Sequence, residues 1–256
     1  MKSTPSKSQL IVARNYESLC DAAVQRMLTL IRVKIADQGI FTMALSGGAT
    51  PKGLYTLMAS SKYRNDFPWE KIHLFWGDER WVLPDDVQAN YSMIADAILT
   101  RVDIPMENIH PIRTRHIDPD QSADLYEQVL KSFFRERKHT TPQFDLMLLG
   151  LGTDGHIASI FPGSPALNEF SRLAIPVHHP ETGQQRITVT LPVINAADNI
   201  FFLVSGREKS EILQRVLQSE SAHSQLPVQQ VRLDHGAAWW FADSGAASLL
   251  KIKEKN

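Results

Sequence analysis

Cysteine and surplus charge are both nearly absent from this chain. Its 256 residues include one cysteine, Cys20, which excludes an internal disulfide and a zinc site built on several cysteines. Lysine and arginine number 27 against 28 aspartates and glutamates, so the formal charge is -1. Nucleic acids and anionic membranes attract proteins with a basic surplus. We therefore expect neither as a partner, and an anionic ligand has to be held by a few placed groups.

Long apolar runs are missing as well. No stretch approaches the roughly 18 apolar residues that span a bilayer, and the beginning, MKSTPSKSQL, lacks the apolar core of a secretory signal. These two absences predict a cytoplasmic protein. Cys20 lies in a helix-like segment, where a buried thiol is favoured over a nucleophile because free cysteine is usually buried.

Apolar strand-like runs alternate with helix-like segments over most of the chain, and several runs are apolar almost throughout, as in DLMLLG and NIFFLV. This predicts an α/β fold with an open, mostly parallel sheet and helices on both faces. We expect a single domain at 10–250, between a flexible segment at 1–9 and a polar tail at 251–256. The expected helices are 15–38, 51–59, 91–99, 122–137 and 207–217, and the expected strands are 41–45, 72–76, 144–149, 187–191, 200–204 and 238–241.

The loop Ser46-Gly47-Gly48-Ala49-Thr50-Pro51 lies between an expected strand and an expected helix. Ligands of such sheets bind at the carboxyl ends of the strands. The paired glycines let backbone N–H groups approach a ligand beside a helix N-terminus, with Thr50 suited to the N-cap. Leu54 stands where a Walker A loop needs lysine. The loop is equally typical of a phosphate site and of a plain strand-to-helix turn.

A second glycine-rich loop, GLGTDGHIAS at 150–159, follows another apolar strand. It satisfies G-x-G-x-x-G, but Phe161-Pro162-Gly163 breaks the helix that a dinucleotide site needs, and about 20 residues on there is no strand that ends in an acidic residue. We interpret the glycines, Gly152 among them, as shaping a loop that presents Asp154 and His156. A histidine takes a proton at neutral pH, and a carboxylate fixes its tautomer. Catalysis and a structural histidine are equally open at this point.

Charged residues follow two further strands. Asp78-Glu79-Arg80 comes after IHLFW and by itself is more typical of a solvated turn. In a crevice, Arg80 can bind a phosphate or carboxylate through two hydrogen bonds while Asp78 or Glu79 orients a partner. Lys209 opens the helix after NIFFLV, where its charge suits an anion. Arg186, at the start of RITVTL, is a further candidate cation. A solvated surface charge is the alternative for both residues, and it is favoured more for Arg186 than for Lys209.

Four segments together resemble one family: LSGGATPKGLY, WGDERWVLPDD followed by AN, LLGLGTDGHIASIFPGS and LVSGREKSEIL, in this order. They are similar to the 6-phosphogluconolactonases of the sugar-phosphate-isomerase-like superfamily, over about residues 10 to 245. The resemblance implies an open Rossmann-like sheet and hydrolysis of 6-phospho-D-glucono-1,5-lactone to 6-phospho-D-gluconate, a step of the oxidative pentose phosphate pathway. It implies a small sugar-phosphate lactone as the binding partner, no metal, no organic cofactor and no obligate protein partner.

The resemblance also implies roles for individual residues. His156 is the implied general base that activates water, and Asp154 supports it. Arg80 and Lys209 add positive charge at the phosphate end of the substrate, while the role of Arg186 is left open. The other implied binding residues are Ser46, Gly47, Gly48 and Thr50 at the phosphate, together with Asp78, Glu79 and Gly152 around the substrate.

Two other functions compete with the lactonase. Glucosamine-6-phosphate deaminase/isomerase shares S-G-G-x-T-P and D-G-H-I-A, but it has an acid five positions after the histidine, where this chain has Phe161. A non-catalytic sugar-phosphate sensor can dispense with His156 and usually carries a DNA-binding segment. The sequence shows no helix-turn-helix pattern and no basic stretch. Both observations favour the lactonase.

Overall fold

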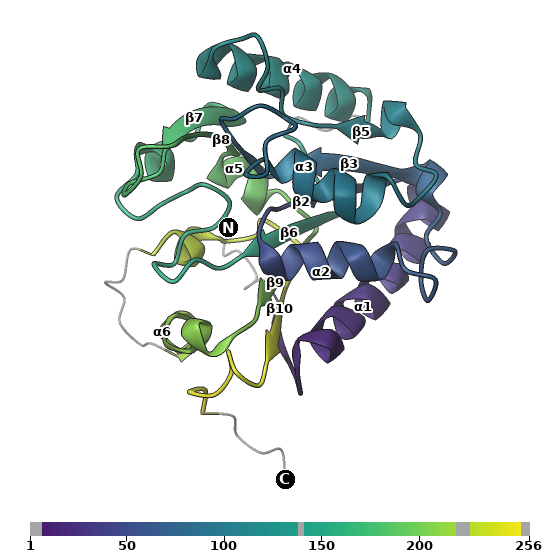
Figure 1. Cartoon of the computed structure of the whole chain (residues 1–256), viewed down its shortest axis with the longest axis vertical. Helices are drawn as coiled ribbons and strands as arrows, with labels where there is room; N and C mark the ends of the chain where they lie inside the picture. Colours follow the sequence, from purple (N-terminus) through teal and green to yellow (C-terminus); the bar gives the residue numbers. More distant parts are fainter. Residues whose placement is uncertain (1–6, 138–140, 219–225, 252–256) are drawn as a thin grey trace.

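Seven parallel strands form the main sheet of the structure, a computed structural model that describes residues 7–137, 141–218 and 226–251. Their order is β1-β10-β9-β6-β2-β3-β5 (Figure 1). In that order they are β1 (Lys7–Ala13), β10 (Ala237–Asp243), β9 (Asn199–Val204), β6 (Leu146–Gly150), β2 (Phe41–Leu45), β3 (Ile72–Trp76) and β5 (Ile109–His110). β2 and β9 are buried at every position, as parallel strands covered on both faces are. The predicted α/β class with an open, mostly parallel sheet is confirmed.

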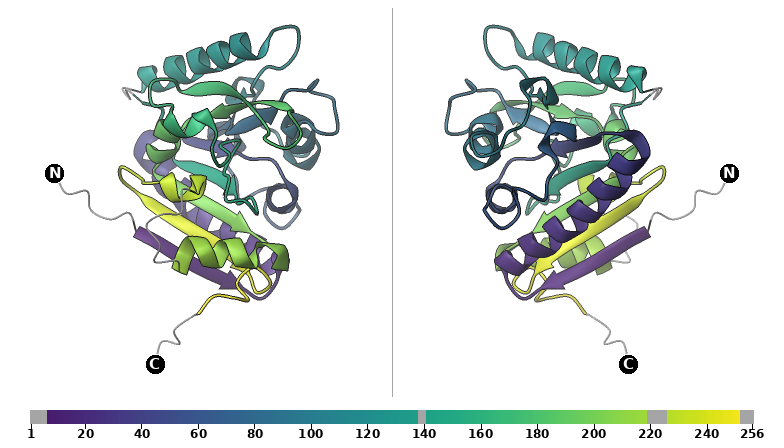
Figure 2. Two further views of the ribbon diagram at one scale, coloured as in Figure 1. Left: turned by 90° about the vertical axis from the view of Figure 1, so that its left-hand side faces the viewer. Right: turned by 90° about the vertical axis from the view of Figure 1, so that its right-hand side faces the viewer.

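Helices lie on both faces of this sheet. They are α1 (Tyr16–Gln38), α2 (Ala49–Met58), α3 (Asn90–Ile94), α4 (Pro119–Glu136), α5 (Leu191–Asn195) and α6 (Ser210–Gln218). α1 packs against β1, β10 and β2, and Figure 2 shows α6 across the opposite face of β1 and β10. Within the described ranges, no helix has the length and apolar character needed to cross a membrane.

The ends of α1 follow from its sequence. The Asn15 side chain caps the first turn by accepting the N–H of Ser18 at 2.9 Å. At the other end Gly39 adopts φ 85° and donates its N–H to Ile35 O, a left-handed cap that glycine adopts without strain. The buried face repeats at helical spacing, through Leu19, Ala23, Met27 and Ile31. The helix predicted at 15–38 is confirmed.

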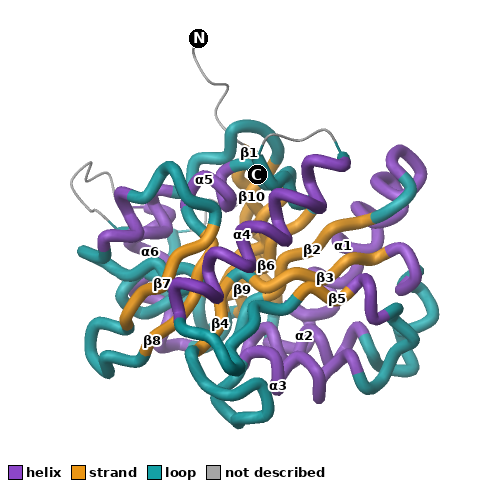
Figure 3. Tube along the Cα trace, turned by 90° about the horizontal axis from the view of Figure 1, so that it is seen from above, coloured by secondary structure: helices purple, strands orange, loops and turns teal. Residues whose placement is uncertain are grey.

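A second sheet, antiparallel and three-stranded, corrects the expectation of one sheet. It consists of β4 (Asp78–Arg80), β8 (Gln185–Val189) and β7 (Ala174–His178), in the order β4-β8-β7. The strand expected at 187–191 corresponds to β8, which lies outside the main sheet and ends before α5 begins. α4 packs on β7 and β8, and Figure 3 shows these strands apart from β2, β3 and β5. A five-residue apolar run carries no signal for the sheet it joins, so the sequence could not separate the two.

The N-terminal region also differs from its prediction. Residues 7–9 of the expected flexible segment belong to β1, whereas 1–6 and 252–256 lie outside the described residues. β1 pairs with β10 on one side only, so it is an edge strand of the main sheet. Leu10 and Val12 remain 39% and 40% exposed there. A short strand in a polar segment, with exposed apolar residues, gives a weak signal in the sequence.

The strand order of the main sheet reverses between β2 and β6. From β2 the chain continues outward through β3 and β5, and from β6 it continues the other way through β9 and β10. β2 and β6 pair only through Met43 with Leu146 and Ala44 with Met147, so their carboxyl ends are unpaired with each other. Ligands of open α/β sheets bind in the crevice at such a reversal. The loops after β2 and β6 are the two glycine-rich loops of the sequence.

Candidate active site

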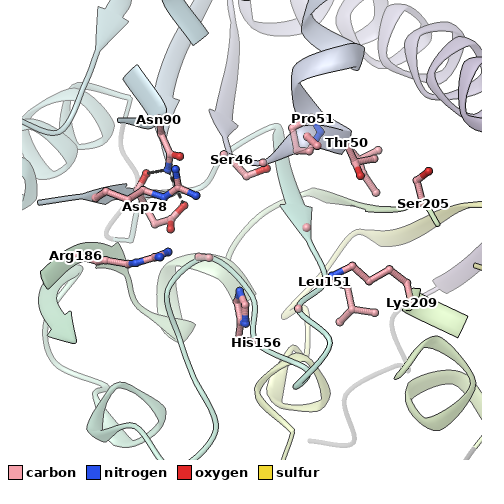
Figure 4. A pocket seen from close by; sticks show the side chains of 18 of the residues that line it. Ser46, Thr50, Pro51, Asp78, Asn90, Leu151, His156, Arg186, Ser205 and Lys209 are labelled. Carbon is pink, nitrogen blue, oxygen red and sulfur yellow. Dashed lines mark hydrogen bonds between the residues drawn. The ribbon is translucent and has the colours of Figure 1, made fainter. Parts of the chain in front are cut away.

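A cavity of about 310 Å³ lies at the carboxyl ends of the central strands. In Figure 4, Arg186 and Asp78 lie on one side of it and Lys209 and Ser205 on the other, with His156 between them. From the predicted site the cavity lining includes Ser46, Gly47, Gly48, Thr50, Asp78, Arg80, Gly152, His156, Arg186 and Lys209. Asp154 and Glu79 were predicted but do not line it. The lining also includes Ala49, Pro51, Asn90, Gly150, Leu151, Ala158, Leu203, Ser205 and Glu208.

The loop between β2 and α2 offers unpaired donors to the cavity. The N-cap of α2 is Gly48, at φ 107°; the prediction of Thr50 as the N-cap is wrong, because Thr50 lies inside the first turn. Glycine adopts this conformation without strain and has no side chain to cap the helix. The N–H groups of Gly47 and Gly48 donate to no group within the described residues. Free donors at the positive end of a helix dipole suit an anion.

Ser46 and Asn90 both line the cavity, and each has a buried polar atom without a partner within the described residues. The Ser46 Oγ and the Asn90 Oδ1 are both buried, and neither has a hydrogen-bond partner in the described part of the chain. A Cβ at Gly47 would lie 1.8 Å from Asn90 Oδ1, so only glycine fits between them. Buried polar groups in proteins are normally hydrogen-bonded. The two atoms are therefore suited to a polar ligand.

Two arginines face each other across the small sheet. Arg80 and Arg186 are register partners in β4 and β8, and the Nε of each is buried without a partner among the described residues. Burial lowers the pKa of Arg186, with Asp78 opposing that shift and Arg80 adding to it. Like charges opposite each other destabilise an antiparallel pair, whereas guanidinium groups bind phosphate and carboxylate in bidentate fashion. The pair is suited to a strongly charged anion.

His156 faces the cavity from the loop after β6. Its Nδ1 lies 2.6 Å from Asp154 Oδ1, and its backbone N–H donates to the same oxygen at 3.1 Å. A carboxylate at Nδ1 holds the imidazole proton there and leaves Nε2 as the proton acceptor. Burial raises the pKa of Asp154, but the hydrogen bonds from His156 outweigh burial and hold that pKa below its ordinary value. Asp154 is therefore placed to orient His156 rather than to touch a ligand.

Gly152 leaves room for this imidazole. A Cβ at Gly152 would lie 2.1 Å from His156 Nδ1 and 2.5 Å from Asp154 Oδ1. The N–H of Gly152 donates to His156 O at 2.9 Å, and the ring of Phe161 packs against the imidazole with centroids 4.8 Å apart. The second glycine-rich loop thus presents Asp154 and His156 as the sequence predicts.

Glu79 lies elsewhere than predicted. It is 1% exposed and does not reach the cavity. Its carboxylate accepts the N–H groups of Arg80 at 2.8 Å, Asn90 at 2.6 Å and Tyr91 at 2.7 Å. Burial raises the pKa of Glu79 to about 7, although these three N–H groups lower it. Its contacts join β4 to the start of α3, so Glu79 holds two cavity residues in place instead of binding a ligand.

Asn90 is a cavity residue that the sequence analysis missed. Its Nδ2 donates to Asp78 O at 2.9 Å, while the Asp78 carboxylate accepts the hydroxyl of Ser159 at 2.6 Å. The available signal was the pair AN after WGDERWVLPDD. Asparagine is common at helix starts for capping reasons, so the pair alone could not indicate a ligand contact.

The segment after β9 contributes Lys209 and Ser205. The Ser205 hydroxyl donates to Asp243 Oδ2 at 2.5 Å, and the N–H of Gly206 donates to the same carboxylate. Lys209 lies in a short 3-10 turn that leads into α6 and lines the cavity with Glu208. The sequence indicated Lys209 through its position after an apolar strand. It gave no sign that the Ser205 hydroxyl is already committed to Asp243.

The cavity combines anion donors with one imidazole. Backbone N–H groups, two guanidinium groups and an ammonium group suit an anionic ligand, and His156 Nε2 can accept a proton beside it. In the described ranges, no three His, Cys, Asp or Glu side chains are grouped so as to hold a metal ion. Such an arrangement is suited to proton transfer to or from a ligand that carries a phosphate or carboxylate group.

Comparisons with known proteins agree on one family. Residues 14–240 match the family described as glucosamine-6-phosphate isomerases/6-phosphogluconolactonase. A 6-phosphogluconolactonase of Synechocystis is 43% identical over 243 residues, which are 95% of this chain and 98% of that protein. A solved 6-phosphogluconolactonase of Trypanosoma brucei is similar at 28% identity and a TM-score of 0.84, over 96% of this chain and 99% of the other. A monomeric glucosamine-6-phosphate deaminase shares the fold at 20% identity and a TM-score of 0.79, over 94% of this chain and all of the other.

Proposed function

The chain belongs to the glucosamine-6-phosphate isomerase/6-phosphogluconolactonase family, and from that membership we propose that it hydrolyses 6-phospho-D-glucono-1,5-lactone to 6-phospho-D-gluconate. The Synechocystis relative that carries this activity in its name matches over nearly its whole length. The observation that carries the proposal is the pairing of His156 and Asp154 at a cavity rich in anion donors. A sugar-phosphate lactone needs both a phosphate site and a base for water.

The phosphate end of the substrate binds to the loop after β2 and to the cationic side chains. The N–H groups of Gly47 and Gly48 and the Ser46 hydroxyl donate to phosphate oxygens. Arg80 and Lys209 supply positive charge there, and Arg186 adds a second guanidinium beside Arg80. This assignment gives Arg186 the role that the sequence left open.

His156 activates the water. Its Nε2 accepts a proton as the water oxygen attacks C1 of the lactone, and Asp154 stabilises the imidazolium that forms. The tetrahedral oxyanion then collapses and the C1–O bond to the ring oxygen breaks. The imidazolium returns its proton to that ring oxygen, which becomes the C5 hydroxyl of 6-phosphogluconate. No cofactor enters the balance of this reaction.

The competing isomerase reaction lacks a proton-transfer group here. In the isomerases an acid follows the histidine by five positions, and the corresponding Phe161 is a buried phenyl ring packed on His156. A phenyl ring neither gives nor takes a proton. Ammonia release from glucosamine 6-phosphate at a rate comparable with lactone hydrolysis would reverse the choice.

The decisive experiment measures lactone hydrolysis at controlled pH against the uncatalysed rate. Wild type is expected to exceed that rate, and His156→Ala to lose about 10²- to 10⁴-fold in kcat while still binding 6-phosphogluconate. His235→Ala is a suitable control because His235 contacts Asp198 and does not line the cavity. Full activity in His156→Ala would refute the assigned mechanism, and an inactive wild type would refute the function.

A further inference from the structure

Two buried tyrosines make the same pair of hydrogen bonds at the ends of neighbouring strands. The Tyr55 hydroxyl, from α2, accepts the N–H of Ser46 at 3.0 Å and donates to Ser46 O at 2.9 Å. The Tyr126 hydroxyl, from α4, accepts the N–H of Trp76 at 2.9 Å and donates to Trp76 O at 2.7 Å. Both side chains are buried, at 0% and 2% exposure. Each phenol therefore satisfies both backbone groups of one residue at a strand end, which is the last residue of β3 for Trp76 and the residue after β2 for Ser46.

The chain beyond the two tyrosine contacts is held differently. After Trp76, the N–H of Gly77 donates to Leu45 O at 2.8 Å and Gly77 O accepts the N–H of Val189 at 2.9 Å. The next residues then pair with β8. Because of these bonds, the loss of the Tyr126 contact leaves the following segment anchored.

No such anchors follow Ser46. The N–H groups of Gly47 and Gly48 donate to nothing within the described residues, and the next backbone bond joins the N–H of Lys52 to Gly48 O at 3.1 Å. On the far side of the glycines, the Tyr16 hydroxyl donates to Ala49 O at 3.1 Å and to Thr50 O at 2.9 Å. The two glycines are thus held from outside, by Tyr55 before them and Tyr16 after them.

We propose that Tyr55 is a positioning residue for anion binding: it fixes Ser46 so that the free N–H groups of Gly47 and Gly48 and the Ser46 hydroxyl converge on one phosphate. The ligand class rests on the proposed function. Tyr55 touches no ligand, since it does not line the cavity. Removing its hydroxyl leaves a buried N–H and C=O of Ser46 unpaired, and the loop then relaxes toward other partners. Binding of the phosphate has to restore the loop geometry, which weakens affinity.

The test compares Tyr55→Phe with Tyr126→Phe, its matched control. Both variants remove one hydroxyl and two backbone hydrogen bonds from a buried site, so both are expected to lower Tm. Only Tyr55→Phe is expected to weaken the affinity for inorganic phosphate and 6-phosphogluconate, by about tenfold in calorimetric titration. It is also expected to raise KM for the phosphorylated lactone about tenfold with kcat changed less than threefold. Tyr126→Phe is expected to keep each value within about twofold of wild type.

Unphosphorylated glucono-1,5-lactone separates positioning from general damage. If Tyr55 acts through the phosphate, kcat/KM for this lactone changes less than threefold in Tyr55→Phe while that for the phosphorylated lactone falls about tenfold. Equal losses on the two lactones, or equal losses of phosphate affinity in the two variants, overturn the proposal. If wild type fails to hydrolyse the lactone, the proposed function is refuted. The calorimetric comparison of the two variants still tests the role of Tyr55.

Amide exchange in the wild-type protein gives a readout that needs no variant. The amides of Ser46 and Trp76 are both expected to exchange slowly, because each donates to a buried phenol. The amides of Gly47 and Gly48 are expected to exchange fast and to slow down when inorganic phosphate is added. Fast exchange at Ser46, or no effect of phosphate on the two glycines, contradicts the proposal whether or not Tyr55→Phe folds.

Discussion

The two sides of the cavity differ in the groups that they offer to an anion. The glycine side consists of Gly47, Gly48 and Gly152, on the loops after β2 and β6, and works through backbone N–H groups and through the space that missing side chains leave. The arginine side consists of Arg80 and Arg186 with Asp78, on β4 and β8, and works through half-buried guanidinium groups whose Nε atoms are buried. The glycine side carries no charge, whereas the arginine side places two like charges opposite each other, and an anion relieves their repulsion.

This difference predicts different effects of substitution on the two sides. A Cβ at Gly47 or Gly152 would overlap a neighbouring side chain, and a Cβ at Gly48 would be strained by its φ of 107°, so these substitutions are expected to damage geometry and activity together. In the arginine pair, burial and the like charge opposite each guanidinium cost stability, and Asp78 offsets part of that cost. Substitution in the pair is expected to damage binding while leaving stability unchanged or slightly higher.

The largest effect is expected from Gly152→Ala on the glycine side. The new Cβ would lie 2.1 Å from His156 Nδ1, so the imidazole has to move away from its position beside Asp154. We expect kcat to fall by about 10²-fold or more, as it does when a positioned base is lost. Gly150→Ala is the control for a methyl group added at the cavity, because Gly150 also lines it but a Cβ there meets no atom of the described residues within 4 Å. Equal kcat values for the two variants would show that the crowding at Gly152 has no catalytic consequence.

Arg186→Gln tests the arginine side. Loss of a charge-assisted hydrogen bond of about 1.5–3 kcal/mol predicts a rise in KM of about 10- to 100-fold. Thermal unfolding without ligand is expected to occur at the same temperature as in wild type or slightly higher, whereas added phosphate stabilises the variant less. Arg115→Gln, which removes an exposed pair with Asp85, is the control for both readouts. A large drop in Tm without ligand would mean that Arg186 serves the fold rather than the ligand.

Glu79→Gln tests whether the residue that holds Arg80 on the arginine side makes the stability of the protein depend on pH. Since burial raises the pKa of Glu79 from its ordinary 4.5 to about 7, the folded protein holds a proton in that window that the unfolded chain has lost. Wild-type stability is therefore expected to fall, relative to Glu79→Gln, as pH rises from 4.5 to 7. Urea denaturation at several pH values measures the difference.

Glu169→Gln is the control for that pH series. Hydrogen bonds from Ser171 and Arg172 hold the pKa of its carboxyl at about 2. Stability from this group is present above pH 4.5 and is lost only as pH falls toward 2. Between pH 5 and 8 the free energies of unfolding of Glu169→Gln and wild type are expected to change with pH in the same way. If that of Glu79→Gln also changes as in wild type, the predicted effect of Glu79 on stability is contradicted.

The smallest effect is expected from Ser205→Ala. The hydroxyl proton of Ser205 is already donated to Asp243, so it adds no donor for a phosphate. We expect KM to change less than about threefold, in contrast to Ser46→Ala, whose hydroxyl has no partner within the described residues. Initial-rate kinetics on both variants decide this point. A larger KM increase for Ser205→Ala would place the phosphate nearer to β9.

The two sides of the cavity also differed in how far the sequence could predict them. The glycine side follows from local signals: a strand, a glycine-rich loop and a helix lie within about a dozen residues of one another. The arginine side requires Arg80 and Arg186 to pair across an antiparallel sheet from distant parts of the chain, and nothing in either segment names its partner. Arg186 was a candidate only through its charge and the family resemblance.

Three further differences have local physical causes. Thr50 was expected as a helix cap because of its hydroxyl, but the flexibility of Gly48 lets the helix begin two residues earlier. Glu79 was expected at the substrate because it belongs to a run of charged residues after an apolar strand, yet strand geometry turns alternate side chains to opposite faces. Asn90 contributes an acceptor whose importance depends on the fit against Gly47, which no linear pattern contains.

The pairing of β1 with β10 has a consequence for when the protein can fold. The strand nearest the start of the chain lies beside the last strand, and the hydroxyl of Ser244 donates to Arg14 O just beyond them at 2.8 Å. During synthesis β1 leaves the ribosome before β10 and has no partner until residues 14–236 between them have emerged. Contacts between such distant segments slow folding. Closure of this sheet edge is therefore expected to be a late event, and a chain that stops before β10 leaves β1 without its partner.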